Sequence, residues 1–208
     1  MWGRPSKCPG RLCTLSPALV SAAAFTRHEL LVVFGCLVVL LVLGLAWRTR
    51  SNDIPRRKGC ERNLKNLLAG FEGYANANEH LPAAGRMGAL NDQDWIYWQT
   101  DRVLADSALA QYTPTFQGTT LRCAGDTGFR YRNYPYSYSM NVNFEKAATR
   151  RIPNHSQIIL LNEENSPNDG ARVKGQPTDV LTTRHGGLSA AGFMDGHVEF
   201  ISEKSGVR

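Results

Sequence analysis

The sequence predicts an α+β fold in which a long N-terminal helix packs on a small antiparallel sheet. Three observations predict it: an uncharged apolar run of membrane length, an amphipathic stretch directly after it, and a hairpin signal near the C-terminus. The expected parts in chain order are a basic leader (1–24), a transmembrane helix (25–48), an amphipathic helix (49–80) and a globular domain (81–208).

The apolar run extends from Leu30 to Trp47 without a charged residue. As a helix it reaches about 27 Å, which spans the hydrocarbon core and places Trp47 at the interface. A secretory signal peptide would have a shorter apolar region that ends in small residues, whereas this run ends in Trp-Arg. The run therefore predicts a membrane anchor. Its orientation does not follow from charge, because basic residues flank both ends.

An amphipathic helix is predicted after the membrane run because apolar residues recur there at helical spacing. Pro55 lies near its start, so either one helix continues through this proline or the chain kinks there. Asn76, Asn78 and Leu81-Pro82 indicate its end. The predicted core stripe contains Cys60, Leu64, Leu67, Leu68, Phe71, Tyr74 and Ala75.

The segment AGFMDGHVEF is the strongest hairpin signal in the chain, because Asp195-Gly196 suits a two-residue turn. Such a turn pairs Met194 with His197 and Phe193 with Val198. Gly196 supplies the positive φ. The predicted apolar face of the hairpin contains Ala191, Phe193, Val198 and Phe200.

A short buried strand is predicted for QIILL, residues 157–161, followed by the polar stretch NEENSPNDG. Its acids Glu163, Glu164 and Asp169 could supply oxygen ligands to calcium. Their spacing matches no calcium-binding loop, so an exposed turn is the prediction.

Cys60 and Cys123 are the two cysteines expected outside the leader and the membrane. In an oxidising compartment we expect them to form a disulfide that ties the amphipathic helix to the domain. Loop closure would then stabilise the fold by about 4 kcal/mol. Two buried free thiols are the alternative.

Glu29 stands at the entrance of the apolar run, in AFTRHELLVV at residues 24–33. An unpaired carboxylate costs roughly 2.5–3.5 kcal/mol at mid-bilayer and less near the interface. Cleavage between Ala24 and Phe25 would create an α-amino group four residues before Glu29. That amine could neutralise the carboxylate, on the same helix or on a neighbouring subunit.

This segment resembles the prepilin processing site of type IV pilins and type II secretion pseudopilins, with a basic leader, a small residue, then Phe, Thr and Glu. The resemblance implies that a prepilin peptidase cuts before Phe25 and methylates the new amine, and that Glu29 guides subunit assembly. His185, followed after nine residues by Asp195-Gly196, is similar to the H-X9-DG motif near the C-terminus of prepilin-like families. The segment YSMN, downstream of a cysteine, is similar to the same families.

The resemblance implies a subunit of a type II secretion or type IV pilus-like assembly. It would be single-pass in the inner membrane, with a cytoplasmic N-terminus and a periplasmic domain. Its expected partners are the prepilin peptidase, other pseudopilin-like subunits and inner-membrane lipid. We expect no cofactor and no metal. We expect no nucleic-acid partner, because loss of the leader removes three basic residues and halves the net charge of +6.

Two alternatives remain open. The first is a membrane-tethered periplasmic binding module that does not polymerise, favoured by Arg27 and His28 where pilin-like families are apolar. The second is a tethered hydrolase. The chain has no HExxH or CxxC motif and no nucleophile motif, so an enzyme is not the prediction. A hydrolase would have to use His185, Asp195, His197, Glu199 and Glu163.

Overall fold

The computed structural model describes residues 26–126, 134–177 and 179–202, with the side chains of 49–52 excepted. The proposed processing site at Ala24 and Phe25 lies outside these residues. The chain divides into two compact units, with the boundary between Leu45 and Ala46.

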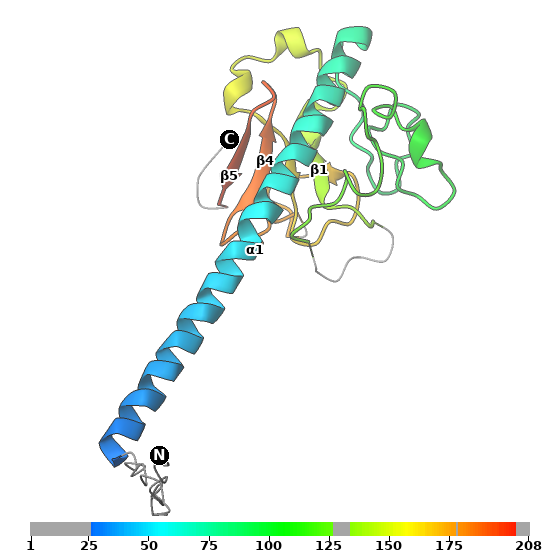
Figure 1. Cartoon of the computed structure of the whole chain (residues 1–208). Coiled ribbons are helices and arrows are strands. Elements are labelled where there is room, and N and C mark those ends of the chain that lie inside the picture. Colours follow the sequence, from blue (N-terminus) through cyan, green and yellow to red (C-terminus); the bar gives the residue numbers. More distant parts are fainter. Residues whose placement is uncertain (1–25, 127–133, 178, 203–208) are drawn as a thin grey trace, which may run out of the picture. The chain divides into compact units, whose positions relative to one another are not determined.

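Helix α1 extends without interruption from Arg27 to Asn78, and Pro55 lies inside it (Figure 1). Of the two arrangements considered at Pro55, the structure therefore has one helix that continues through the proline. In the first unit, every residue from Thr26 to Leu45 is exposed. This part of α1 is long and apolar enough to cross a membrane. Glu79, with a φ of 64°, directly follows α1 in the left-handed conformation typical of a helix C-terminus.

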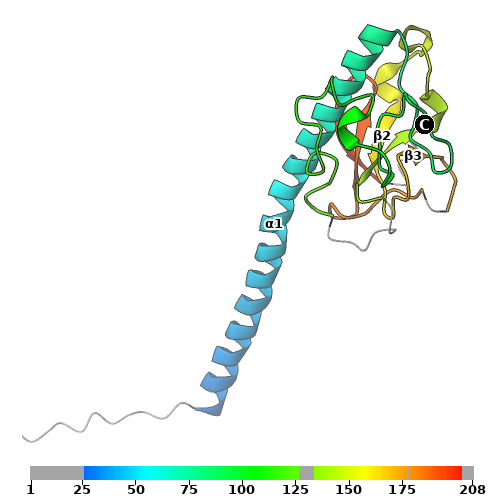
Figure 2. The same ribbon diagram turned by 90° about the vertical axis from the view of Figure 1, so that its right-hand side faces the viewer.

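The second unit contains a five-stranded sheet. Its strands are β1 (Tyr138–Asn141), β2 (Ile159–Glu163), β3 (Ala171–Arg172), β4 (Ser189–Phe193) and β5 (Val198–Ile201). They lie in the order β3-β1-β2-β4-β5, and Figure 2 labels β2 and β3. Neighbouring strands are antiparallel except β1 and β3, which are parallel. The 3₁₀ turns are η1 (Leu104–Asp106), η2 (Val142–Phe144), η3 (Thr149–Arg151) and η4 (His155–Gln157). The predicted α+β class is thereby confirmed.

The C-terminal half of α1 packs on one face of the sheet, through the predicted apolar stripe, whose members are all buried. Gly192 of β4 allows the close approach, because a Cβ there would lie 2.8 Å from a methyl carbon of Leu68. Phe71 contacts Trp95 at a ring distance of 5.7 Å, and the Trp95 indole donates a hydrogen bond to the carbonyl of Gly170. Helix, sheet and the loop containing Trp95 thus share one core.

The opposite face of the sheet is also covered. A second apolar cluster there contains Ile159, Leu181, Ala191, Phe193 and Ile201. Because successive side chains of a strand point to opposite faces, β4 contributes to both cores and all five of its residues are buried.

The prediction of a two-residue hairpin turn is wrong, because the loop is one residue longer. Gly192 pairs with Val198, and the Phe193 amide donates to the carbonyl of His197 at 2.9 Å. The loop therefore has three residues, with Gly196 at a φ of 90°, as in a turn closed by a glycine bulge. This register places Phe193 and Phe200 in different clusters rather than on one face.

The prediction of an exposed turn after Leu161 is also wrong. Strand β2 continues to Glu163, and both Glu163 and Glu164 are fully buried. The Glu163 carboxylate has polar neighbours in segments distant in sequence, namely the His185 ring and the Ala190 amide. Burial, reinforced by the negative charge of Asp179, raises the pKa of Glu164 to about 9.

Candidate functional site

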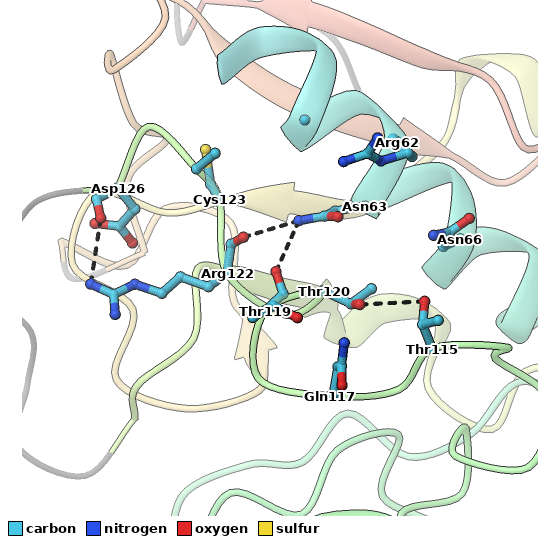
Figure 3. A pocket seen from close by; sticks show the side chains of 12 residues that line it. Arg62, Asn63, Asn66, Thr115, Gln117, Thr119, Thr120, Arg122, Cys123 and Asp126 are labelled. Carbon is cyan, nitrogen blue, oxygen red and sulfur yellow. Dashed lines mark hydrogen bonds between the residues drawn. The ribbon is translucent and has the colours of Figure 1, made fainter. Parts of the chain in front are cut away.

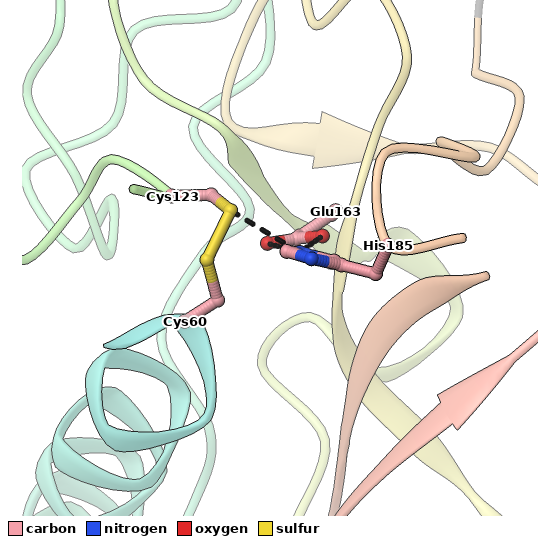
Figure 4. Close-up of side chains that lie close together, drawn as sticks. All are labelled: Cys60, Cys123, Glu163 and His185. Atoms are coloured by element: carbon pink, nitrogen blue, oxygen red, sulfur yellow. Dashed lines mark hydrogen bonds and ion pairs between the residues drawn. A yellow bond between two sulfur atoms is a disulfide. The ribbon is translucent and has the colours of Figure 1, made fainter. Parts of the chain in front are cut away.

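A buried polar cluster lies between α1 and the sheet (Figure 4). Cys60 of α1 and Cys123 of the loop after it form a disulfide with an S–S distance of 2.17 Å and a Cα–Cα distance of 4.9 Å. Glu163 at the end of β2 and His185 from the loop before β4 lie against it. All four residues are at most 1% exposed. Four separate segments of the chain therefore meet at this point, which we call the Cys-His-Glu cluster.

His185 joins the disulfide to the sheet. Its Nε2 lies 3.1 Å from Oε2 of Glu163 and 3.3 Å from Sγ of Cys123. Its ring packs edge-on against Phe200 at 5.2 Å. The His185 ring therefore contacts a strand of the sheet, because Glu163 belongs to β2.

Two charged residues of α1 hold the other side of His185. Nδ1 of the imidazole lies 3.8 Å from Oδ1 of Asp53, whose second oxygen is 3.1 Å from Nε of Arg57. The Arg57 guanidinium also donates a hydrogen bond to the main-chain carbonyl of His185 and lies over the Phe200 ring. Both the ring and the backbone of His185 are thereby positioned against the helix.

The structure does not bring His185 together with Asp195, the other end of the H-X9-DG spacing. His185 precedes β4 and is buried, whereas Asp195 follows β4 in the terminal hairpin loop. Asp195 accepts a hydrogen bond from the His197 amide at 3.2 Å and pairs with its ring. Asp195 and Gly196 therefore have local roles in the hairpin.

Glu29 occupies the first turn of α1. Its Oε2 accepts hydrogen bonds from the Thr26 amide at 2.8 Å and from the Thr26 hydroxyl at 2.9 Å. In return the Glu29 amide donates to the Thr26 hydroxyl at 3.3 Å. This reciprocal arrangement is a capping box, and the sequence spacing Thr-x-x-Glu could have predicted it. It gives the carboxylate polar partners at the entrance of the apolar run.

A polar cleft of about 600 Å³ runs beside the disulfide (Figure 3). The amide nitrogen of Asn63 on α1 donates to the carbonyls of Thr119 and Arg122, at 3.2 and 3.0 Å, and so joins helix and loop. No sequence motif marks this cleft, because ordinary polar residues form it. Its lining includes Arg62, Asn63, Asn66, Gln117, Arg122 and Cys123.

The described residues offer one group that could hold a metal ion, which is the Cys-His-Glu cluster. The acids considered for calcium do not form such a group. Glu163 belongs to the Cys-His-Glu cluster and contacts His185. Asp169 accepts hydrogen bonds from the amides of Met87 and Ala171, both at 2.8 Å. Two other histidines form hydrogen bonds with main-chain carbonyls. The His80 ring bonds to the carbonyl of Leu81, and the His155 ring bonds to the carbonyl of Thr149.

Comparison with known proteins finds a similarity to a competence protein. It is 28% identical over 74 residues to competence protein ComGC of Halalkalibacterium halodurans, covering 36% of this chain and 71% of ComGC. No family model matches the chain. No solved structure matches it. The chain is therefore a distant relative of ComGC, a type IV pilin-like protein, and has a pilin-like architecture.

Proposed function

We propose that this protein is a membrane-anchored, pilin-like subunit of a type II secretion or type IV pilus-like assembly, cut by a prepilin peptidase before Phe25. The observation that carries the proposal is the segment of α1 from Leu30 to Trp47, which is apolar around its whole circumference and exposed along its length. Such a helix requires lipid or other apolar helices as its surroundings. The distant relationship to ComGC supports the same role.

Glu29 is the residue through which we expect subunits to recognise each other. In the described chain its carboxylate is satisfied by Thr26 of the same helix. Cleavage before Phe25 places a cationic amine one residue from Thr26, and this amine competes for the same carboxylate. When the amine belongs to a neighbouring subunit, the pair fixes the axial position of one helix against the next. Small residues along the run, such as Gly35 and Gly44, permit close helix contact.

We place the protein in the inner membrane as a single-pass subunit with a cytoplasmic N-terminus and a periplasmic domain. The disulfide between Cys60 and Cys123 supports an oxidising compartment for the domain. The role is structural: the disulfide occupies both sulfurs of the Cys-His-Glu cluster, so neither serves as a nucleophile.

A second function is favoured by Arg27 and His28, which are exposed in the first turn of α1. Charged side chains at this position oppose tight packing of helices within a bilayer. The protein would then be a tethered periplasmic module that does not polymerise, and the polar cleft beside Asn63 would be its binding site.

Native gel sizing of the chain extracted from membranes with a mild detergent separates the two functions. A subunit of an assembly runs as multimers, and Glu29→Gln shifts them to the monomer because the pairing charge is lost. Glu61→Gln is the matched control, since Glu61 is a partly exposed glutamate of the same helix that pairs with Lys65 in its own chain. A monomer for the unaltered chain would instead establish the tethered module, and multimers that persist in Glu29→Gln would exclude the pairing role.

A further inference from the structure

We propose that the Cys-His-Glu cluster binds one Zn²⁺ ion when the disulfide is reduced, so that a disulfide and a metal are alternative links between α1 and the sheet. The ligands would be the thiolates of Cys60 and Cys123, Nε2 of His185 and a carboxylate oxygen of Glu163. This inference concerns the domain alone and does not depend on the proposed role in an assembly.

The donor atoms are already gathered for such an ion. One ligand atom from each of the four residues lies within 4.8 Å of all the others, and all four side chains are buried. Two sulfurs, one imidazole nitrogen and one carboxylate oxygen form a tetrahedral donor set that suits zinc. With Zn–S bonds of about 2.3 Å, the two sulfurs of a tetrahedral site lie about 3.8 Å apart, so the ion can bind only after the disulfide is reduced.

The groups behind the ligands are those that a zinc site requires. The Gly125 amide donates to Sγ of Cys123 at 3.3 Å, which stabilises a thiolate. The Ala190 amide donates to Oε2 of Glu163 at 3.3 Å. Asp53 stands 3.8 Å behind Nδ1 of His185, so the imidazole can present Nε2 to a metal while its other nitrogen faces a carboxylate.

A structural disulfide alone does not account for this arrangement. The bond needs two cysteines, whereas the cluster also buries a carboxylate and an imidazole whose Nε2 lies between the carboxylate and a sulfur. Burying a polar pair of this kind carries a desolvation cost. A bound cation would offset that cost in the reduced state.

Reduction and metal entry have a route, because Cys123 lines the polar cleft (Figure 3). A dithiol reductant attacks a disulfide sulfur as its thiolate, forms a mixed disulfide, and leaves as a disulfide itself. The protein gains two electrons and two protons as two thiols. Zn²⁺ then replaces those two protons, which are released to solvent.

The test uses the full chain in detergent with Cys8→Ser, Cys13→Ser and Cys36→Ser, which leaves Cys60 and Cys123 as the remaining cysteines. The protein is prepared oxidised, or reduced with a phosphine, and is titrated with zinc chloride. Bound zinc is measured by elemental analysis after gel filtration, and affinity by competition with a chelator. We expect one zinc per reduced chain and none per oxidised chain. Equal binding by both forms, or no binding by the reduced form, would overturn the proposal.

Variants separate the folded site from thiols that bind metal in an unfolded chain. Cys60→Ser should abolish binding, and Asp53→Asn should weaken it about 10–100-fold through the imidazole. Glu163→Gln should weaken it more than Asp53→Asn does, and Glu61→Gln should leave it unchanged. Cobalt in place of zinc should show thiolate-to-metal charge-transfer absorption that is lost in Cys60→Ser. Unchanged affinity in both Asp53→Asn and Glu163→Gln would show binding by an unfolded chain and would refute the site.

If the reduced chain unfolds in the presence of a chelator, refolding on addition of zinc tests the same site. The site predicts that one equivalent of zinc restores the near-ultraviolet circular dichroism of the oxidised protein. Failure to restore it would refute the proposal.

Discussion

Loss of the Cys60–Cys123 disulfide should lower the free energy of unfolding of the domain by about 4 kcal/mol. The two cysteines are 63 residues apart in sequence, and the chain-entropy relation for a loop of that length gives this magnitude at 25 °C. The perturbation is Cys60→Ala together with Cys123→Ala, which removes the bond without leaving a thiol. Both positions are buried, and alanine leaves only the small space of a sulfur atom.

The assay is equilibrium unfolding in urea, followed by near-ultraviolet circular dichroism. Trp95 reports on the core, because it is fully buried against Phe71. At a urea dependence of about 2 kcal/mol per molar, the loss corresponds to a fall of about 2 M in the midpoint. A chelator is present throughout, so that metal binding does not contribute. Cys36→Ala is the control, because this free cysteine is exposed in the apolar run.

A loss below about 1 kcal/mol, with an unchanged urea dependence, would refute the reasoning. It would mean that α1 and the loop at Cys123 are held together mainly by packing. Asn63, which joins the same two segments by two hydrogen bonds, would then be the first residue to examine.

Two further predictions concern the core. Gly170→Ala should lower the free energy of unfolding in urea by about 1–3 kcal/mol, because the added Cβ would lie 2.8 Å from the carbonyl oxygen of Ala84. Gly118→Ala should cost little, because nothing lies within 4 Å of the Cβ added there. Equal effects of the two substitutions would contradict the packing. In the folded protein the pKa of Glu164 is raised from an ordinary 4.5 to about 9, first by burial and then by the charge of Asp179. The stability due to its protonation is therefore full below pH 4.5 and is lost as the pH rises through 9. Glu164→Gln should therefore become more stable than the unaltered disulfide-bonded chain as the pH rises, by at most about 3 kcal/mol at pH 7. A difference in the free energy of unfolding that stays constant from about pH 5 to 9 would show that Glu164 is ionised when folded.

The helical elements were the most predictable part of the fold. The stripe from Cys60 to Ala75 recurs at helical spacing and is buried as a set, because one face of a helix packs against one face of a sheet. The sequence could not decide whether Pro55 interrupts the helix.

The register of the hairpin and the fate of the acids after Leu161 were not predictable from local pattern. Asp195-Gly196 suits both a two-residue turn and a three-residue loop, and only the pairing of β4 with its neighbours selects one. Glu163 appears in the sequence as the start of a polar loop. Its partner His185 is 22 residues away, so the contact that makes its burial tolerable has no local signature.

The candidate site was predictable residue by residue but not as a group. Cys60, Cys123 and His185 each stood out in the sequence, for redox chemistry or for a motif. Their spacing fits no metal-binding pattern, because the four residues of the Cys-His-Glu cluster come from one helix, one strand and two loops. Only the fold brings these side chains to one point, and only the fold separates His185 from Asp195.

The most direct test of the central claim is the intact mass and N-terminal peptide of the protein extracted from membranes of a cell that also expresses a prepilin peptidase. A pilin-like subunit predicts a chain that begins at Phe25 with a methylated amine and has lost residues 1–24. An intact Met1, or a cut at another position, would contradict processing at this site and would make the tethered module the better account.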